Sequence, residues 1–474
     1  MTPLALRAAL LAIAAAALAP SLAAQSTDSA PGSRALESPL ASPPFPSSDW
    51  VNAYVVGEPD GTPDYPLQKA VFGTALAVSR VKIYGWAEVG ANVSTSSNTN
   101  APLVYGIVPN AVELDQLVLR FDRAPNTAQL AKVDWGFRFT SLFGIDYRAT
   151  TAKGWFSDQL LQHNALYGYD PVELYGVLYL PRVAQGMVLK LGRYISPADI
   201  EDPFAVDNYL FSHSLPVAVD PTTFTGVQGT VRLSPQWELT IGADAGSDMA
   251  PWSNSARLNG QLLVRWVSRS GSDGVWGGLN SIGSGSFTNG HDDLQQVVAV
   301  WGHRFDSTVH IQTEAYYEWQ FDAARSGSCN YGPVRSYGGG GGCGPIIPGR
   351  SEALGIVNYL EFLFWPNDYL SVRNDYLNDV QGQRSGYATP YTSLTVGWAH
   401  WISSLFLVRP EVRYERSYLV PAYDGGIAKD QATASLDLIA RFRARAALLR
   451  AQRCGGVHVT RAARGQIARQ RGDQ

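Results

Sequence analysis

The chain has 474 residues, of which 16% are charged, 46 are glycine and 53 are aromatic, namely 13 Trp, 23 Tyr and 17 Phe. So many aromatic residues argue against disorder. A mean hydropathy of −0.09, without an apolar run of about 18 residues beyond the N-terminus, argues against a helical membrane protein. The net charge is −4; since the last 32 residues carry +7 and Arg7 carries +1, the residues between carry −12, which excludes nucleic acid as a partner.

The first 24 residues have the pattern of a signal peptide. Arg7 supplies the positive charge, residues 8–19 are apolar, and small residues allow cleavage after Ala23 or Ala24. An anchor helix is the less favoured alternative, because the apolar run is shorter than the roughly 20 residues that cross a bilayer. We therefore expect export to a compartment in which disulfides persist.

Residues 25–80 form a lead-in that is rich in Pro, Ser, Ala and Asp. It contains turn signals such as Pro43-Pro44 and Asp60-Gly61. This composition predicts an extended periplasmic segment with little structure. Residues 50–56 are compatible with either a short strand or a plug-like segment, and the sequence leaves both open.

From residue 81 to residue 442, sixteen segments alternate between an apolar and a polar face. In the strand expected over residues 131–148, for example, Trp135, Phe137 and Phe139 alternate with polar or small residues. A period of two is the pattern of a strand with one apolar face. A soluble β-sandwich shows the same alternation, so the alternation alone does not distinguish the two classes.

The connections between these segments discriminate better. Short connections such as 183–185, 235–236 and 367–368 alternate with long ones such as 195–221 and 323–351. Tight turns on one side and long loops on the other are typical of outer-membrane barrels. We therefore predict an all-β fold, a transmembrane antiparallel up-and-down β-barrel of about 16 strands, with 14 or 18 as alternatives. A barrel of that size is wide enough for a water channel.

The last predicted strand ends in an apolar alternation that includes Leu436, Leu438 and Phe442. A terminal amphipathic strand ending in Phe is similar to the signal that the barrel-assembly machinery recognises. The tail 443–474, with eight Arg and one Asp, departs from that pattern. A disordered appendage or an altered reading frame is favoured over a functional basic arm.

Truncation after Phe442 is expected to leave membrane insertion intact, because the apolar face stops there and the tail has no strand periodicity. The measurement is assembly of the truncated and full-length proteins into membranes. Failure of the truncated protein alone would show that the tail is structural.

Catalytic and ligand motifs are sparse. The sequence contains neither Gly-x-Ser-x-Gly nor His-Glu-x-x-His. Gly339, Gly341 and Gly344 match a dinucleotide-binding spacing, but no strand precedes them and no helix follows. We therefore expect no catalytic residue, no metal site and no cofactor.

Charged residues on the polar face of two late strands are the candidate pore wall. They are Arg373, Asp375, Arg409, Glu411, Arg413 and Glu415. On the lipid side an Arg near the midplane would cost roughly 2–4 kcal/mol, so these residues should face the lumen. There they could stabilise the wall as hydrogen-bonded pairs, set a transverse field across the pore, or do both.

Several stretches resemble the OmpL-like β-barrel porin family of Gram-negative bacteria. They are 82–86 (KIYGW), 134–138 (DWGFR), 147–148 (YR), 191–194 (LGRY), 208–214 (NYLFSHS), 225–227 (TGV) and 409–414 (RPEVRY). The resemblance runs from about residue 50 to residue 442. It implies an outer-membrane barrel with porin activity, and it supplies no substrate and no catalytic residues.

The third outer loop, residues 195–221, is the leading candidate for a functional segment. It carries Asp199, Glu201, Asp202, Asp207 and Asp220 and neither Lys nor Arg. In porins the corresponding loop commonly folds inward, so we expect these acids to line a constriction opposite the wall arginines. The alternative is an ordinary outer loop.

The favoured function is passive diffusion of small polar solutes through a charged channel in the cell outer membrane. The expected partners are outer-membrane lipid, the barrel-assembly machinery and the solutes, with a homotrimer as a further possibility. The acidic excess of the loop predicts a weak cation preference. Replacing Asp199, Glu201 and Asp202 by amides should then shift the reversal potential toward anions. An outer-membrane enzyme and a surface-binding or adhesion barrel are the alternatives.

Cys329 and Cys343 are expected to form a disulfide in the long loop that contains them. Their 14-residue separation would contribute roughly 3 kcal/mol by restricting the unfolded chain. Thiol titration of the unreduced protein is the measurement. Two reactive thiols at these positions would contradict the prediction.

Overall fold

The computed structural model describes residues 32–36, 39, 52–59, 79–103, 105–163, 165–326, 344–403 and 405–442. The predicted signal peptide, the tail 443–474 and both cysteines of the expected disulfide lie outside these residues.

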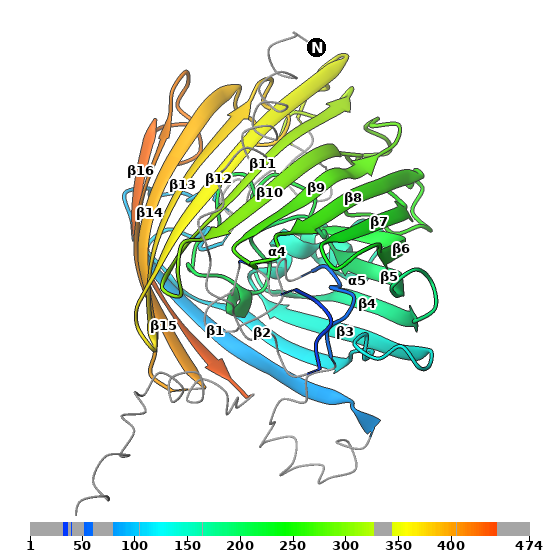
Figure 1. The fold of residues 1–474 in the computed structure, drawn as a ribbon. Coiled ribbons are helices and arrows are strands. Elements are labelled where there is room, and N and C mark those ends of the chain that lie inside the picture. The colour runs from blue at the N-terminus through cyan, green and yellow to red at the C-terminus, as the bar shows by residue number, and fades with distance from the viewer. Residues whose placement is uncertain are drawn as a thin grey trace, which may run out of the picture.

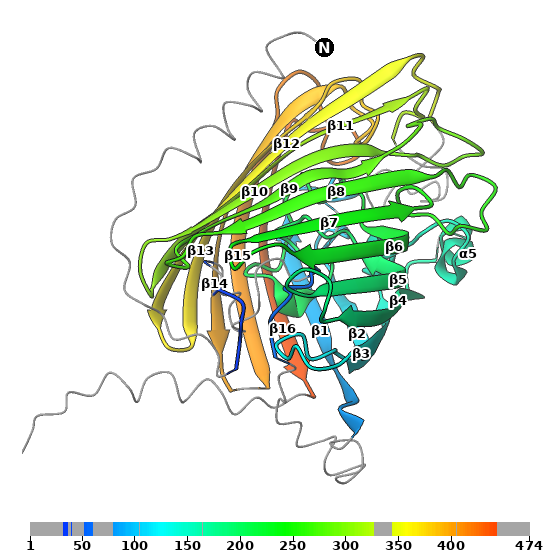
Figure 2. The ribbon, with the colours of Figure 1, turned by 45° about the vertical axis from the view of Figure 1, so that its right-hand side comes forward.

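Sixteen antiparallel strands in the described part of the chain form one closed barrel (Figures 1 and 2). They are β1 (Lys82–Ser94), β2 (Val112–Arg123), β3 (Asp134–Gly144), β4 (Gly168–Leu180), β5 (Met187–Ile195), β6 (Thr223–Arg232), β7 (Trp237–Asp244), β8 (Asn259–Val267), β9 (Asp273–Ile282), β10 (Gln295–Arg304), β11 (Val309–Phe321), β12 (Arg350–Trp365), β13 (Asp368–Asp379), β14 (Thr389–Trp401), β15 (Phe406–Ser417) and β16 (Asp430–Arg441). Each strand pairs with its neighbours in sequence, and β1 closes the barrel on β16, with Trp86 opposite Arg441 and Asn92 opposite Ser435. The predicted fold class and the favoured strand number are confirmed.

The alternation of side chains sorts each strand into an outer and an inner face. On β16, Leu436 and Leu438 are 46% and 45% exposed, while Asp437 between them is fully buried. Apolar residues therefore cover the outside, and charged residues point into the barrel. This is the arrangement that lipid outside and a polar interior require.

The connections are also sorted as predicted. The turns from β4 to β5, from β6 to β7 and from β12 to β13 are short, whereas long loops join β3 to β4, β5 to β6 and β11 to β12. We call the two ends of the barrel the short-turn end and the long-loop end.

Some strand boundaries differ from the expectation, and the one before α4 has a clear physical reason. The strand predicted over residues 131–148 is shorter, because β3 ends at Gly144 and the short helix α4 (Tyr147–Thr150) follows it. A second helix, α5 (Phe156–Gln162), lies in the same loop. Gly144 has a φ of 152° and lies against the backbone of Asp115, and a side chain would not fit there. Among the described residues, no helix has the length and apolar character of a membrane-spanning helix.

Candidate functional site

The loop between β5 and β6 lies inside the barrel and crosses it. On one side, Trp276 on β9 donates to the carbonyl of Pro197 over 3.1 Å, and Tyr316 on β11 donates to the carbonyl of Pro216 over 2.9 Å. On the other side, Gln116 on β2 donates to the carbonyl of Pro203 over 2.9 Å. In the closed barrel, β2 lies roughly opposite β9 to β11. The segment from Ile195 to Thr223 therefore bridges opposite walls of the lumen.

Glu201 joins the middle of this loop to the wall. Its carboxylate lies 3.0 Å from the Arg373 guanidinium on β13 and accepts hydrogen bonds from Tyr359 on β12 and from the Ser214 amide. Burial raises the pKa of Glu201, but the charge of Arg373, together with His213 and the hydrogen bonds that the carboxylate accepts, lowers the pKa overall. Glu201 is thus a buried anion with a fixed cationic partner. Arg373 also lies 3.5 Å from Asp375 on its own strand.

Strand β15 supplies the second set of loop contacts. Arg409 donates to the carbonyls of Ala205 and Asn208, both over 2.8 Å, and Glu411 accepts from the amides of Phe211 and Ser212 over 3.0 and 3.1 Å. Ala205 belongs to a short 3-10 helix, η1 (Ala205–Asp207). The loop thus meets a wall that offers donors to its carbonyls and acceptors to its amides.

The wall charges also pair with one another. Arg409 lies 2.6 Å from Asp437 and 3.2 Å from Glu88, and Arg413 lies 2.7 Å from Glu415 and donates to the carbonyl of His213. All six predicted wall residues therefore face the interior on β13 and β15. The pairing supports their role in stabilising the wall and the loop, and the transverse field remains a proposal.

The remaining loop acids occupy different surroundings. Asp202 accepts from the Phe204 amide over 2.7 Å, and its carbonyl accepts from Asn208 over 2.6 Å, so it shapes the loop itself. Asp207 lines a pocket whose other lining residues include Tyr84, Trp86 and Arg120. The four predicted constriction acids thus do not form one ring.

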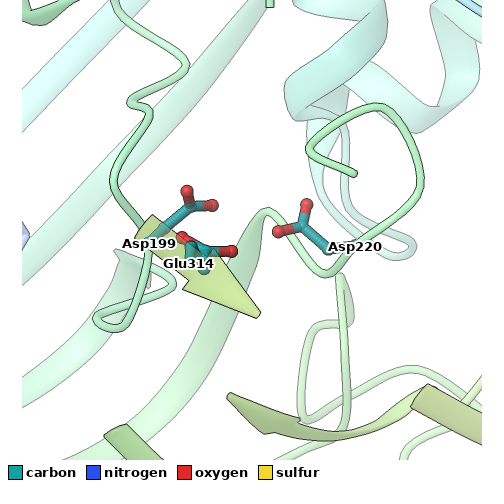
Figure 3. Close-up of side chains that lie close together, drawn as sticks. All are labelled: Asp199, Asp220 and Glu314. Carbon is teal, nitrogen blue, oxygen red and sulfur yellow. The ribbon is translucent and has the colours of Figure 1, made fainter. Parts of the chain in front are cut away.

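Asp199 belongs to a cluster of three carboxylates with Asp220 and Glu314 (Figure 3). The ligand atoms of the three residues all lie within 4.8 Å of one another. Glu314, on β11, accepts from the Ile200 amide over 2.8 Å. Burial raises the pKa of Asp199 to about 7, and burial together with Asp199 raises the pKa of Asp220. The side of the loop that faces β11 is therefore acidic, and the side that faces β13 and β15 meets arginines.

Sequence reasoning missed several residues that hold this loop. Gln116, Glu314 and Tyr359 each lie at an inward position of a strand, which the alternation does reveal. The alternation does not reveal that strands from three places in the chain meet one loop. His213 was also missed: the Tyr105 ring stacks on it with centroids 3.7 Å apart, and burial lowers the pKa of His213 to about 4.

The predicted assembly residues lie on the last strand. Leu436 and Leu438 point outward, and the amide of Phe442 donates to the Gly85 carbonyl on β1 over 3.1 Å. A side chain at Gly85 would collide with the Phe442 ring. Phe442 therefore packs where the last strand meets the first.

Three solved structures of porins and outer-membrane channels are similar to this chain over about three quarters of its length, 76%. The anion-selective porin from Comamonas acidovorans is 9% identical, with a TM-score of 0.46 over 76% of this chain and 99% of its own. Salmonella typhi OmpF in complex with daunomycin is 11% identical, with a TM-score of 0.48 over 76% of this chain and 97% of its own. The outer-membrane channel DcaP of Acinetobacter baumannii is 11% identical, with a TM-score of 0.45 over 76% of this chain and 96% of its own. No curated protein matches the sequence.

A family model described as putative beta-barrel porin-2, OmpL-like, matches residues 80–442. These limits coincide with the sixteen-strand barrel and its closing contact at Phe442. Because this match covers well over half of the chain, the protein belongs to the putative beta-barrel porin-2, OmpL-like, family.

Proposed function

We propose that the protein is an outer-membrane channel through which small polar solutes diffuse passively, narrowed by residues 195–221. The observation that carries the proposal is the course of this loop, which contacts β9 and β11 on one side of the lumen and β2 on the other. A loop held across a polar barrel reduces the open cross-section and brings every solute close to fixed charges.

The charged residues on the two sides of the loop differ in sign. Asp199, Asp220 and Glu314 gather on the β11 side, and Arg373, Arg409 and Arg413 lie on the other. The arginines are all paired with carboxylates, whereas the three acids share one site. We therefore propose a weak cation preference, with charged solutes oriented across the gap between the two faces.

The proposal includes location and assembly. The chain would be exported by residues 1–24, would enter the outer membrane through the barrel-assembly machinery, and would present its long loops outward. A homotrimer is part of the proposal, since sixteen-strand porins commonly form trimers. Chemical crosslinking of the membrane-inserted protein checks the oligomer.

Single-channel recording of the refolded mature protein in planar bilayers tests the function. The expected result is discrete conductance steps with a reversal potential that indicates weak cation preference under a salt gradient. Heat-unfolded protein is the control. Folded protein that inserts without conductance, both as the unchanged chain and after Val56→Asp, would contradict the channel and would favour the enzyme or the adhesion barrel.

A further inference from the structure

The inner wall of β4, β5 and β6 carries an apolar patch that extends from the short-turn end, at Tyr179 and Val188, toward the long-loop end, at Tyr194 and Phe224. The patch consists of Tyr175, Val177, Tyr179, Val188, Tyr194 and Phe224, all of which are buried in one cluster. Their inward direction follows from their neighbours, since Leu174, Leu178 and Leu191 on the same strands are exposed on the outer surface. A water-filled lumen calls for a polar wall, so this patch needs a cover.

Residues 52–58 of the lead-in provide that cover, and we call them the inner segment. Val56 is fully buried within the patch, and Tyr54 packs against it. Both short N-terminal stretches that the structure describes, drawn in dark blue, lie within the outline of the barrel in Figures 1 and 2. The apolar side chains of the inner segment therefore match the apolar wall.

Inward side chains of the wall hold the backbone of the inner segment. The Val56 amide donates to Glu238 on β7 over 2.9 Å, and the Val56 carbonyl accepts from Arg232 on β6 over 2.7 Å. Lys190 on β5 donates to the Asn52 carbonyl over 3.1 Å and lies 5.4 Å from the centre of the Tyr54 ring. A buried backbone group without a partner is costly, so these bonds make the seat specific for an extended chain.

The turns at the short-turn end add further contacts. The Gly57 amide donates to the Thr127 hydroxyl over 3.0 Å, and the Thr127 amide donates to the Glu58 carbonyl over 3.2 Å. Arg34 donates to the carbonyls of Ala128 and Gln185 over 2.7 and 3.1 Å, which ties two turns together. Gly57 has a φ of 115°, a backbone conformation that residues with a side chain adopt only with strain, so glycine suits this position.

We propose that the inner segment is an intraluminal plug that narrows the channel at the short-turn end, in series with the loop 195–221. Its seat is the apolar patch together with Glu238, Arg232 and Lys190. Ala53 packs against a cluster that contains Ala198 and Leu215 of the loop as well as wall residues, so the inner segment and the loop share one apolar cluster. The plug is additional to the proposed function, because the loop would narrow the channel without it.

Substituting Val56→Asp in the full mature chain tests the plug. An unpaired carboxylate inside the apolar patch and beside Glu238 would displace the segment. Single-channel conductance in planar bilayers should then rise above that of the unchanged protein. Val183→Asp is the matched control, because Val183 is 41% exposed in the turn between β4 and β5 at the same end. Its conductance should equal that of the unchanged protein.

Arg34→Gln is the second variant, because it removes contacts of the lead-in without altering any strand. The conductance of the Arg34 variant should also rise. If the Val56 variant fails to fold, the Arg34 variant alone tests the plug. Heat-dependent electrophoretic mobility shows whether each variant has folded. Equal, non-zero conductance in the unchanged protein and in either folded variant would overturn the plug while leaving the proposed function standing. A closed unchanged protein with a conducting variant would support the plug. Folded proteins that all fail to conduct would overturn both proposals.

Discussion

Replacing Arg373 by Met is expected to release the loop 195–221 from the barrel wall. Arg373 and Glu201 are both buried, and their ion pair spans 3.0 Å. Removing one partner of a buried pair leaves the other charge uncompensated, which typically costs about 3–5 kcal/mol. The measurements are faster hydrogen exchange of the amides of Phe211 and Ser212 and a larger single-channel conductance.

A second substitution separates the ion pair from the packing around it. Adding Glu201→Gln to the Arg373 variant removes the unpaired anion, so part of the loss in stability should be recovered. Arg416→Met is the matched control, because Arg416 pairs with Asp430 at a solvent-exposed position and holds no part of the loop. Unchanged exchange of the loop amides in the Arg373 variant would show that this pair does not anchor the loop.

Asp199→Asn is expected to reduce the cation preference of the channel and to weaken its dependence on pH, with Asp220 left as a buried carboxyl of raised pKa in the same cluster. Burial raises the pKa of Asp199 to about 7, so the carboxyl is neutral below that pH and ionised above it. The cation preference of the unchanged protein should therefore grow between about pH 6 and pH 8 and be lost as the pH falls. The attraction between a carboxylate and a cation about 4 Å away in water is about 1 kcal/mol. This energy raises the local cation concentration by a factor of about five.

Reversal potentials under a salt gradient measure this effect at each pH. Low ionic strength is required, since screening shortens the Debye length to about 3 Å at 1 M salt. Asp322→Asn is the matched control: Asp322 is exposed in the loop that follows β11, and its φ of 52° suits Asn. An unchanged pH dependence in the Asp199 variant would show that this carboxyl does not face the permeating ions.

Asp199→Asn tests the charge of the loop more directly than the triple replacement of Asp199, Glu201 and Asp202. Glu201 is bound to Arg373, and Asp202 accepts the Phe204 amide within the loop. Amides at those two positions would disturb the position of the loop as well as its charge. A shifted reversal potential in the triple variant would then have two causes, whereas the Asp199 variant has one.

The barrel itself could be predicted because its determinants are local. Alternation along each strand separates outward residues such as Leu436 from inward residues such as Asp437, and the sorted lengths of the connections reveal the two ends. The inward direction of Arg373, Arg409 and Arg413 follows from the same period of two. The helix α4 was missed because the alternation around residues 145–148 is compatible with a longer strand.

The amino-acid sequence by itself determined the fold class, the strand number, the inward charges and the family, because each depends on neighbours along the chain. Only the tertiary structure decided which of these charges meet. The pairing of Glu201 with Arg373 joins residues 172 positions apart, the carboxylate cluster joins the loop to β11, and Val56 meets Glu238 across 182 positions. Such contacts follow from the closure of the barrel and from the course of two segments through its interior, and no local period records that course.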